Sequence, residues 1–415
     1  MPRKSPILTS TPRGKHKSLR EGLDLQDLLG RPAVNLDTPE LQRFIAGKVI
    51  LVTGAGGSIG SEICRQALRF CPRALVLVER AENALFEIDH ELRERWVGAR
   101  LEPLIADVTD SPRINSILGQ FRPDVVFHAA AHKHVPMMEN NPGEAVKNNI
   151  FGTQIVAEAA AYAGVGTFVL ISSDKAVNPT SVMGASKRVA EMIVQAMNID
   201  DRSAPPHASF AGGLRLLEGP SPEGTGENPA PTRFLAVRFG NVLASSGSVV
   251  PIFRKQIERG GPVTVTHPEM RRYFMTIPEA SQLVMQAAAI GRGGEVFVLD
   301  MGAPIRILDL AERLIRAAGK IPGRDIQIQF CGMRPGEKLF EELCSPEDVT
   351  VPTSHPRIRV WELPRIDLRT VRATLEELRQ VIDAPREHVI SALARAVREY
   401  QPAQSASCLR IAAAA

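Results

Sequence analysis

Short apolar runs alternate with segments of helical spacing from residue 48 to residue 171. The runs are rich in β-branched residues, whereas the segments between them repeat apolar residues at helical spacing, as in Ile63–Leu68 and Ile155–Ala163. Four runs have the length of buried strands: Val49–Val52, Leu75–Val78, Val125–Phe127 and Phe168–Ile171. Strands that alternate with helices are typical of a parallel sheet covered on both faces. We therefore predict an α/β fold with a doubly wound parallel sheet.

The pattern changes after a helix that is predicted at Arg188–Met197. Residues 199–232 contain six prolines and several glycines, which predict a flexible surface insertion. Three later features are a strand at Phe234–Phe239 and amphipathic helices at Leu368–Ile382 and Arg386–Tyr400. The predicted organisation is a disordered basic tail and lead-in (1–46), a nucleotide-binding domain (47–250), a smaller substrate-binding region (251–365) and a C-terminal helical segment (366–415).

Four glycines follow the first predicted strand. They lie in Thr53–Gly60, which reads Thr-Gly-Ala-Gly-Gly-Ser-Ile-Gly, and a helical pattern begins at Ser58. Glycines permit a tight turn and let the backbone approach a pyrophosphate, whose charge is met by the helix N-terminus. An ordinary glycine-rich turn is the alternative. Glu79 ends the next strand, about 20 residues on, and favours a Rossmann-type dinucleotide site because its carboxylate can bind the ribose hydroxyls.

The predicted cofactor contacts lie where apolar runs end. Asp107 follows one such run and is placed to meet the adenine amino group, while the alanines at 129–131 allow close approach of the cofactor. The predicted set is Thr53, Gly54, Gly57, Ser58, Ile59, Gly60, Glu79, Asp107, Val108, Ala129 and Ala130. The Glu79 carboxylate should repel a 2′-phosphate, so we expect NAD rather than NADP. Arg80 beside it argues the other way.

Composition narrows the class of protein. Hydrophobic residues make up 44% of the 415 residues, yet no uninterrupted apolar stretch approaches the length of a membrane span, and the first residues lack the apolar core of a signal peptide. A net charge of +4 is too mild to suggest nucleic-acid binding. The five scattered cysteines fit reduced thiols, so we expect a cytoplasmic protein. The basic residues of 1–22 fit a solvated tail better than a lipid-binding one, because no apolar face accompanies them.

The stretch from Ser172 to Lys187 holds the richest chemistry. It begins where a strand ends, at the edge where open α/β sheets bind ligands. Ser173, Asp174 and Lys175 offer a hydroxyl, an acid and an amine in succession. Lys187 lies four residues after Met183 at the start of a helix, so the two side chains share a face.

With these motifs the chain resembles the extended short-chain dehydrogenase/reductase superfamily, and within it the UDP-sugar (UDP-GlcNAc) 4,6-dehydratases of bacterial capsular and surface polysaccharide biosynthesis. The resemblance covers about residues 23–358 and rests on Thr53–Gly60, Ala129–Pro136, Ser172–Lys175, Arg238–Pro251, Thr266–Ala280 and Arg334–Lys338. It implies that Lys187 holds the nicotinamide ribose and that Ser173 lies near the reacting hydroxyl. It also implies that Asp174 and Lys175 are the acid and base of dehydration.

Met183 departs from the pattern of most of the superfamily, which has tyrosine here to deprotonate the sugar hydroxyl. A thioether cannot do this. The long, membrane-anchored members of the dehydratase family carry methionine at this position, so the resemblance places the chain in that branch. Those members also have an N-terminal membrane domain, and this chain looks like their catalytic portion alone. The group that removes the hydroxyl proton stays open.

The resemblance also implies substrate contacts. Arginine suits a diphosphate because it offers planar bidentate donors. Taken singly, however, Arg272, Arg334 and Lys338 are each equally plausible as ordinary surface residues. The predicted set for the UDP-sugar is Lys133, Asn241, Ser245, Ser248, Arg272, Arg334 and Lys338. The histidines at 128, 132 and 134 have a spacing that fits no zinc site, so we expect a polar loop at the nicotinamide end and no metal.

The predicted function is NAD-dependent, redox-neutral conversion of a UDP-N-acetylhexosamine to its 4-keto-6-deoxy form. Oxidation at carbon 4 acidifies the hydrogen on carbon 5, so a base and an acid can then remove water across carbons 5 and 6. Lys175 and Asp174 meet these needs if burial and neighbours bring their pKa values toward neutrality. A solvated ion pair is the alternative for this pair. A 4-epimerase or reductase, or a non-catalytic NAD-binding protein, are the alternatives for the chain, which we expect to form a homo-oligomer.

Overall fold

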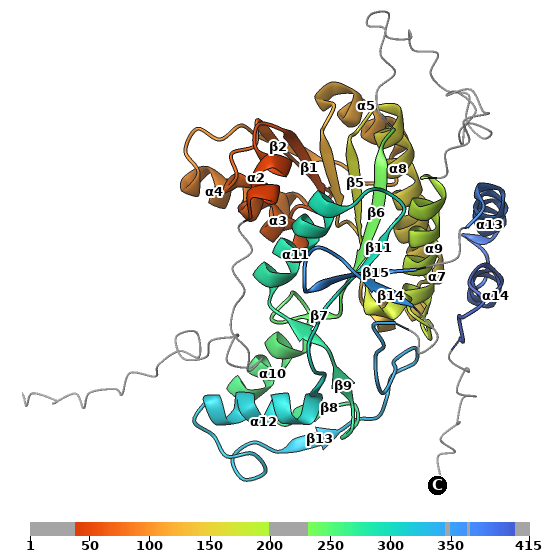
Figure 1. The fold of residues 1–415 in the computed structure, drawn as a ribbon. Helices are drawn as coiled ribbons and strands as arrows, with labels where there is room; N and C mark the ends of the chain where they lie inside the picture. The colour runs from red at the N-terminus through yellow and green to blue at the C-terminus, as the bar shows by residue number, and fades with distance from the viewer. Residues whose placement is uncertain (1–37, 199–230, 345–348, 363–365, 403–415) are drawn as a thin grey trace, which may run out of the picture.

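The computed structural model describes residues 38–198, 231–344, 349–362 and 366–402, and its main feature is one large sheet (Figure 1). Nine strands hydrogen-bond in the order β14-β15-β11-β6-β5-β4-β1-β2-β3. Every neighbouring pair from β3 to β11 is parallel, and β15 and β14 add an antiparallel edge. In chain order the strands are β1 (Val49–Thr53), β2 (Ala74–Glu79), β3 (Leu101–Ile105), β4 (Val125–His128), β5 (Thr167–Ile171), β6 (Arg233–Arg238), β11 (Val296–Leu299), β14 (Thr350–Pro352) and β15 (Ile358–Trp361).

The strand order 3-2-1-4-5-6 is that of the dinucleotide-binding doubly wound fold, which confirms the predicted fold class. All four apolar runs lie within strands because each is buried on both faces of the sheet. The edge strand β3 had no predicted bounds. Only Leu101 in it is buried and Pro103 interrupts it, so its pattern lacks the continuous apolar run of a central strand.

Helices cover both faces of the sheet. On one face the core joins β1 and β2 side chains to helices α2 (Pro39–Ile45), α3 (Ser58–Leu68), α4 (Glu82–Arg95) and α11 (Ile277–Ile290). On the other face the alternate side chains pack against α5 (Ser111–Phe121), α8 (Gly152–Tyr162) and α9 (Val182–Ala196). This division follows from the two-residue period of a strand, which sends successive side chains to opposite faces.

Helix α2 lies in the range that was predicted as a lead-in. Leu41 and Ile45 are fully buried against α11, so the end of the lead-in is a helix that belongs to the core. Pro39 and the Thr38 cap explain the start of the helix, because the Thr38 hydroxyl accepts from the backbone N–H of Leu41 at 3.3 Å. The basic tail at 1–22 and residues 199–230 of the insertion predicted at 199–232 fall outside the described residues.

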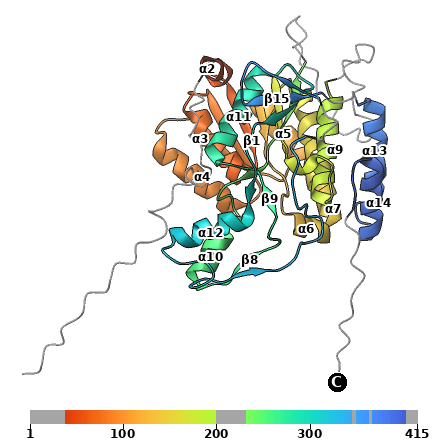
Figure 2. The same ribbon diagram turned by 60° about the horizontal axis from the view of Figure 1, so that its bottom comes forward.

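Two C-terminal helices, α13 (Leu368–Val381) and α14 (Arg386–Ala396), pack against α9 (Figure 2). Leu375, Leu378 and Leu393 join the α9 side chains in one buried cluster. Both helices were predicted, and the second ends four residues before the expected Tyr400. As a result every residue of α9 except Gln195 is buried.

A smaller lobe lies below the sheet in Figure 1 and has its own core. It contains α10 (Val249–Glu258), α12 (Ile307–Ala317), β8 (Val263–Val265) and β13 (Ile328–Phe330). Two short ladders, β7 (Asn241–Val242) with β10 (Phe274–Met275) and β9 (Arg271–Arg272) with β12 (Ile305–Arg306), complete this half. The chain returns to the large sheet at α11 and β11, so the predicted boundary at residue 250 does not coincide with the end of the sheet.

The remaining helices are short. They are α6 (Val135–Asn140), α7 (Pro142–Ala145), the π-helix η1 (Val146–Phe151) and the 3₁₀ turn η2 (Asp174–Ala176). Among the described residues, no helix combines the length and the hydropathy that a membrane span requires.

Candidate active site

The turn between β1 and α3 has the geometry of a phosphate cradle. Gly54 has a φ of +66°, and a Cβ added to it would lie 2.8 Å from the backbone nitrogen of Ala130. At Gly60 an added Cβ would lie 2.1 Å from the carbonyl oxygen of Gly54. Gly57 caps α3 without a side-chain hydrogen bond. The turn therefore needs glycine for close packing, and within the described residues no side chain caps the start of α3.

A cleft of about 200 Å³ opens beside this turn. Seven of the predicted cofactor residues line it: Gly54, Gly57, Glu79, Asp107, Val108, Ala129 and Ala130. Of the remaining four, Thr53 and Gly60 are buried, Ile59 packs against the core, and Ser58 accepts a hydrogen bond from the backbone N–H of Ser246 at 3.2 Å. Arg80, His132 and Asn148 also line the cleft, and they were not among the predicted contacts.

Two carboxylates lie at the end of the cleft. Glu79 accepts from the backbone N–H groups of Gly56, Arg80 and Ala81 at 2.9 to 3.2 Å, which fixes its orientation. Burial favours a higher pKa for Asp107, but hydrogen bonds from Thr109 together with Arg80 hold that pKa below its usual value. The Arg80 guanidinium lies 3.5 Å from Asp107.

This cleft fits a dinucleotide. The glycine turn leaves room for a pyrophosphate at the unpaired start of α3, and the carboxylate of Glu79 can accept ribose hydroxyls. Arg80 lies beside Asp107 in the same cleft, with 3.5 Å between the guanidinium and the carboxylate.

A buried chain of hydroxyls and one histidine lies beneath the cleft. The ring nitrogens of His128 are 2.8 Å from the Thr53 hydroxyl and 3.0 Å from the Thr153 hydroxyl. Burial, reinforced by the charge of Lys187, lowers the pKa of His128 to about 3, so the ring is neutral at physiological pH. Both nitrogens are committed to hydroxyls, and no group of three potential ligands for a metal ion occurs in the described part of the chain.

Asn149 joins the cleft to α9. Its side-chain amide donates to the carbonyl of His132 and to the hydroxyl of Ser186, both at 3.0 Å, and its side-chain oxygen accepts from the His132 N–H at 2.8 Å. It lies on the π-helix η1, and such helices occur frequently at functional sites. The sequence contains no local signal for this role, which depends on two segments that are distant in the chain.

Helix α9 carries Met183 and Lys187, which lie one turn apart. Lys187 Nζ donates to the carbonyl of Ile171 at the end of β5, at 2.6 Å. Burial lowers the pKa of Lys187 to about 8, against the opposing attraction of Glu191. Met183 is only 3% exposed and belongs to the apolar cluster under α13 and α14. Its thioether therefore packs in the core.

A buried ion pair ties α9 to the sheet. Glu191 accepts two hydrogen bonds from Arg238 on β6, at 2.6 and 2.5 Å, and one from the Ser172 hydroxyl at 2.6 Å. The Arg238 guanidinium also lies 3.8 Å from the centre of the Trp361 ring. These contacts hold the strand end that precedes Ser173 in place, and sequence analysis did not identify them.

Ser173, Asp174 and Lys175 form one contact group at the start of η2. The Ser173 hydroxyl donates to Asp174 Oδ1 at 3.0 Å, and Lys175 Nζ donates to the same oxygen at 3.0 Å. The side chain of Asp174 is fully buried and that of Lys175 is 18% exposed. A solvated surface pair is thus excluded. Gly184 lets α9 approach this turn, because a Cβ there would lie 2.1 Å from the carbonyl oxygen of Lys175.

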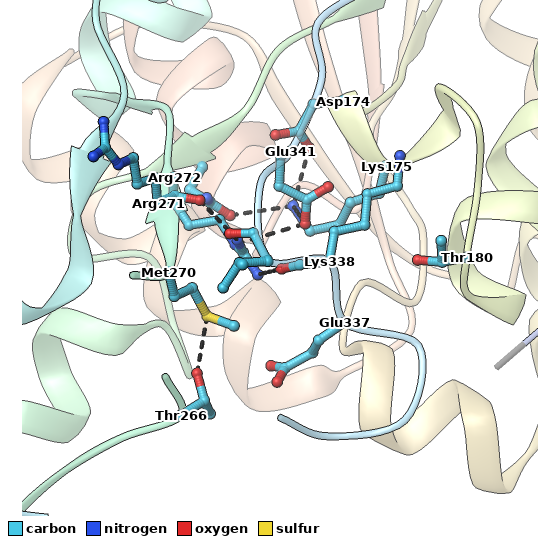
Figure 3. A network of polar contacts seen from close by, with 12 residues as sticks. Asp174, Lys175, Thr180, Thr266, Met270, Arg271, Arg272, Glu337, Lys338 and Glu341 are labelled. Atoms are coloured by element: carbon cyan, nitrogen blue, oxygen red, sulfur yellow. Dashed lines mark hydrogen bonds and ion pairs between the residues drawn. The ribbon is translucent and has the colours of Figure 1, made fainter. Parts of the chain in front are cut away.

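The charge state of Lys175 differs from the expectation. Burial favours a lower pKa for its amine, but the carboxylates of Asp174 and Glu341 outweigh burial and Arg272, and the pKa is raised. We expected burial and neighbours to bring it toward neutrality. Asp174 is adjacent in the sequence, but Glu341 reaches Lys175 only through the tertiary fold, with Oε1 at 3.5 Å from Nζ (Figure 3).

The predicted diphosphate ligands have protein partners in this structure. Arg272 donates to the carbonyls of Arg271 and Lys338, both at 2.7 Å. Lys338 Nζ donates to Glu342 at 2.8 Å and to the carbonyl of Val177 at 3.0 Å. Arg334 is paired with Glu337 at 2.5 Å at the surface. Their geometry brings Arg272 and Lys338 to the rim of the Lys175 site, and it leaves Arg334 further out on an exposed turn.

The other predicted substrate residues come from two facing loops. Asn241 Oδ1 lies 3.4 Å from Lys175 Nζ, so it belongs directly to the acid–base group. Ser245 and Ser248 flank Gly247, where an added Cβ would lie 2.6 Å from the ring of His134. Lys133 precedes that histidine and is exposed. The loop of Ser245–Ser248 therefore lies against the 132–134 loop.

Known proteins resemble this chain over most of its length. Residues 50–362 match the family described as "Polysaccharide biosynthesis protein". The capsular polysaccharide biosynthesis protein CapD of Staphylococcus aureus is 53% identical over 342 residues, which are 82% of this chain and 51% of CapD. The probable polysaccharide biosynthesis protein EpsC of Bacillus subtilis is 50% identical over 361 residues, 86% of this chain and 55% of EpsC.

A solved structure, that of Pen from Bacillus thuringiensis, is 34% identical with a TM-score of 0.65 and covers 78% of this chain and 90% of Pen. The chain spans about half the length of the curated relatives CapD and EpsC. The match over residues 50–362 and the sheet order agree with the resemblance that the motifs indicated. The chain therefore belongs to the polysaccharide biosynthesis protein family and is an extended short-chain dehydrogenase/reductase.

Proposed function

We propose that this protein is an NAD-dependent 4,6-dehydratase that converts a UDP-N-acetylhexosamine to a UDP-4-keto-6-deoxy sugar. The observation that carries the proposal is the buried Asp174–Lys175 pair, which lies at the end of β5. The carbonyl at the end of the same strand receives the hydrogen bond of Lys187. An acid, a base and a cofactor-binding lysine therefore lie within one short segment. The names of the relatives CapD and EpsC support a sugar substrate used for polysaccharide synthesis.

Bound NAD would supply a hydride acceptor for carbon 4, whose hydroxyl loses a proton, and the same hydride for carbon 6, where carbon 5 regains a proton, so the overall reaction is redox-neutral. The cleft residues would hold the adenosine and pyrophosphate part of the dinucleotide, with the glycine turn at the pyrophosphate and Glu79 at the adenosine ribose. Lys187 is placed to hold the nicotinamide ribose, and Ser173 to lie near the hydroxyl on carbon 4. Met183 contributes packing, since a thioether cannot accept that proton.

The elimination needs a neutral amine and a protonated carboxyl group. Lys175 Nζ and Asp174 Oδ1 are 3.0 Å apart, so one proton that moves from the ammonium to the carboxylate produces both at once. Lys175 then takes the proton from carbon 5, the bond between carbon 6 and oxygen breaks, and Asp174 protonates the departing oxygen to give water. After the elimination Lys175 is again an ammonium group and Asp174 is again a carboxylate, so the pair holds as many protons as before.

Asn241 lies beside Lys175, Arg272 lies beside Glu341, and Lys338 lies next to Arg272. The loop that carries Ser245 and Ser248 packs on His134, which follows Lys133, and Arg334 lies further out. We propose that these residues bind the UDP moiety and the sugar. Binding of a diphosphate at Arg272 or Lys338 then requires their present carbonyl and carboxylate partners to be exchanged.

Mass spectrometry of products tests the proposal. The purified chain with NAD and UDP-GlcNAc should yield a sugar nucleotide that has lost one water. A product of unchanged mass with an altered configuration would instead establish a 4-epimerase. The raised pKa of Lys175 favours that second candidate, because a cationic lysine is no base and an epimerase does not need one at this position.

The two lysines have separable roles. Lys175→Ala should still bind NAD, but water loss and incorporation of solvent deuterium at carbon 5 should fall by roughly a hundred- to ten-thousand-fold. Lys187→Ala should lose NAD affinity in a direct titration, because the amine is assigned to the nicotinamide ribose. Turnover of Lys175→Ala near the wild-type rate would show that the dehydration assignment is wrong.

A further inference from the structure

Three acceptors surround the Lys175 amine. Asp174 Oδ1 lies at 3.0 Å, Asn241 Oδ1 at 3.4 Å and Glu341 Oε1 at 3.5 Å from Nζ. An ammonium group has three protons and no lone pair, so three acceptors match its charged form. A neutral amine has one proton fewer and a lone pair, and would leave one of the three acceptors without a donor. The site as it stands is therefore built for the cation.

Glu341 is the member of this group that no role yet explains. Its side chain is 3% exposed, its Oε1 atom lies 3.6 Å from Arg272 Nε, and its Oε2 atom is buried without a hydrogen-bond partner in the described part of the chain. An unpaired buried carboxylate oxygen is costly. A buried carboxylate with an unsatisfied oxygen beside the acid–base pair suggests a function rather than packing.

The backbone before Glu341 is fixed to the strand that carries Arg272. The N–H of Arg271 donates to the carbonyl of Leu339 at 3.2 Å, and Arg272 donates to the carbonyls of Lys338 and Leu339. Phe340 forms a bridge with Arg271. Glu341 therefore reaches Lys175 from a segment that is held to β9 (Figure 3).

We propose that Glu341 is a positioning residue of the acid–base centre: its carboxylate holds Lys175 beside Asp174 and keeps the amine protonated until the elimination needs its lone pair. The inference rests on the proposed dehydration and adds a residue that controls when Lys175 acts. Because Glu341 favours the ammonium form, it opposes the transfer of a proton from Lys175 to Asp174. Arg272 offsets this effect by pairing with the same carboxylate.

Two carboxylates and one guanidinium group surround the amine of Lys175. Asp174 comes from η2, Glu341 from the segment bound to β9, and Arg272 from β9 itself. Asn241 on β7 is neutral. Tyr273 lies beyond Asp174, and burial raises the pKa of its phenol, so it is uncharged at neutral pH. The two carboxylates outweigh burial and the single guanidinium, in agreement with the raised pKa of Lys175.

Acetylation of Lys175 by a dilute acylating reagent, measured against pH by peptide mass spectrometry of the full chain, tests the proposal without any turnover. Glu341→Gln should move the midpoint of labelling down by about one pH unit or more, because an opposite charge within a few ångströms is removed. Glu341→Asp, which keeps the charge, should stay nearer to wild type. Arg272→Gln should move the midpoint up.

Glu342→Gln is the matched control, since this neighbouring carboxylate pairs with Lys338 at 2.8 Å and not with Lys175. Its labelling midpoint should equal that of wild type. An unchanged midpoint in Glu341→Gln, or an equal shift in Glu342→Gln, would overturn the proposal. Should Glu341→Gln not fold, the absence of an upward shift in Arg272→Gln would also overturn it.

The pH profile of water loss gives the second readout. In Glu341→Gln the alkaline limb, where Lys175 loses to solvent the one proton that the pair needs, should move to lower pH. A merely structural role would lower the rate at every pH without moving this limb. If the wild-type chain releases no water from a UDP-N-acetylhexosamine, the proposed function fails. The labelling midpoints still decide the role of Glu341 in that case.

Discussion

Lys175 and Lys187 are both buried close to the end of β5, yet their surroundings move their pKa values in opposite directions. Burial dominates at Lys187, whose single opposing carboxylate is Glu191, and its pKa falls to about 8. At Lys175 two carboxylates outweigh burial, and the pKa rises. Residue type and burial alone therefore do not set the charge of a lysine, because the number of nearby counter-charges decides it.

His128 should make the protein sensitive to acid. Its pKa is about 3 in the folded chain and about 6.5 in the unfolded chain. Between these values the unfolded state binds a proton that the folded state does not, so stability that is present above pH 6.5 is lost as the pH falls toward 3. At pH 5 the loss is about 2 kcal/mol relative to pH 7.

His128→Gln removes this titration. Urea unfolding at pH 7 and pH 5 should therefore show a smaller loss of unfolding free energy in the variant than in wild type, by about 2 kcal/mol. His90→Gln, at a largely exposed histidine, is the control substitution. Equal losses in wild type and His128→Gln would contradict a neutral buried histidine.

At the scale of elements, the turn between β1 and α3 shows why several glycines are needed within seven residues. Gly54 adopts a positive φ, while Gly60 lies on the helix and needs its hydrogen only because the carbonyl of Gly54 is so close. The first is a requirement of backbone conformation and the second is a requirement of packing. Both serve the same cradle.

Gly60→Ala should disrupt this cradle, because its Cβ would overlap the carbonyl oxygen of Gly54 at 2.1 Å. We expect NAD binding to weaken by at least tenfold in calorimetric titration. Gly119→Ala is the matched control on helix α5, where an added Cβ meets nothing within 4 Å. It should keep NAD affinity and gain roughly 0.5 to 1 kcal/mol of stability. Undiminished NAD affinity in Gly60→Ala would refute the assignment.

At the scale of the whole molecule, α13 and α14 connect the C-terminal end of the chain to the active-site helix. Glu139 accepts the N–H of Val182 at the start of α9 at 2.7 Å, and its own carbonyl accepts from Arg386 at 2.8 Å. The apolar cluster beneath contains Met183 together with Leu378. The position of Lys187 thus depends on helices that begin about 180 residues later in the chain.

Leu378→Ala should lower the free energy of unfolding by about 2 to 5 kcal/mol, since this side chain is fully buried under α9. Denaturant titration followed by circular dichroism measures the change. Glu376→Ala, on the exposed side of the same helix, should stay within about 0.5 kcal/mol of wild type. Similar stability of the two variants would show that the C-terminal helices do not brace α9.

The sequence by itself determined the strands from Val49 to Ile171, the glycine turn and the lysine–acid segment after β5. These features are local: a buried strand, a phosphate turn and a helix start each leave a pattern within about ten residues. For the same reason β3 had no bounds, because a half-exposed edge strand with Pro103 carries no such pattern. The motifs were also sufficient to indicate the family.

Only the tertiary structure decided which charges meet. Glu341 lies more than 160 residues after Lys175, and Arg238 lies 47 residues after its partner Glu191. The spacing of these residues in the sequence therefore does not indicate that either pair is in contact. The same holds for Asn149, whose partners lie on two other segments. Because Coulomb and desolvation energies depend on distance in space, the charge of Lys175 could be reasoned about only after the fold had placed both carboxylates beside it.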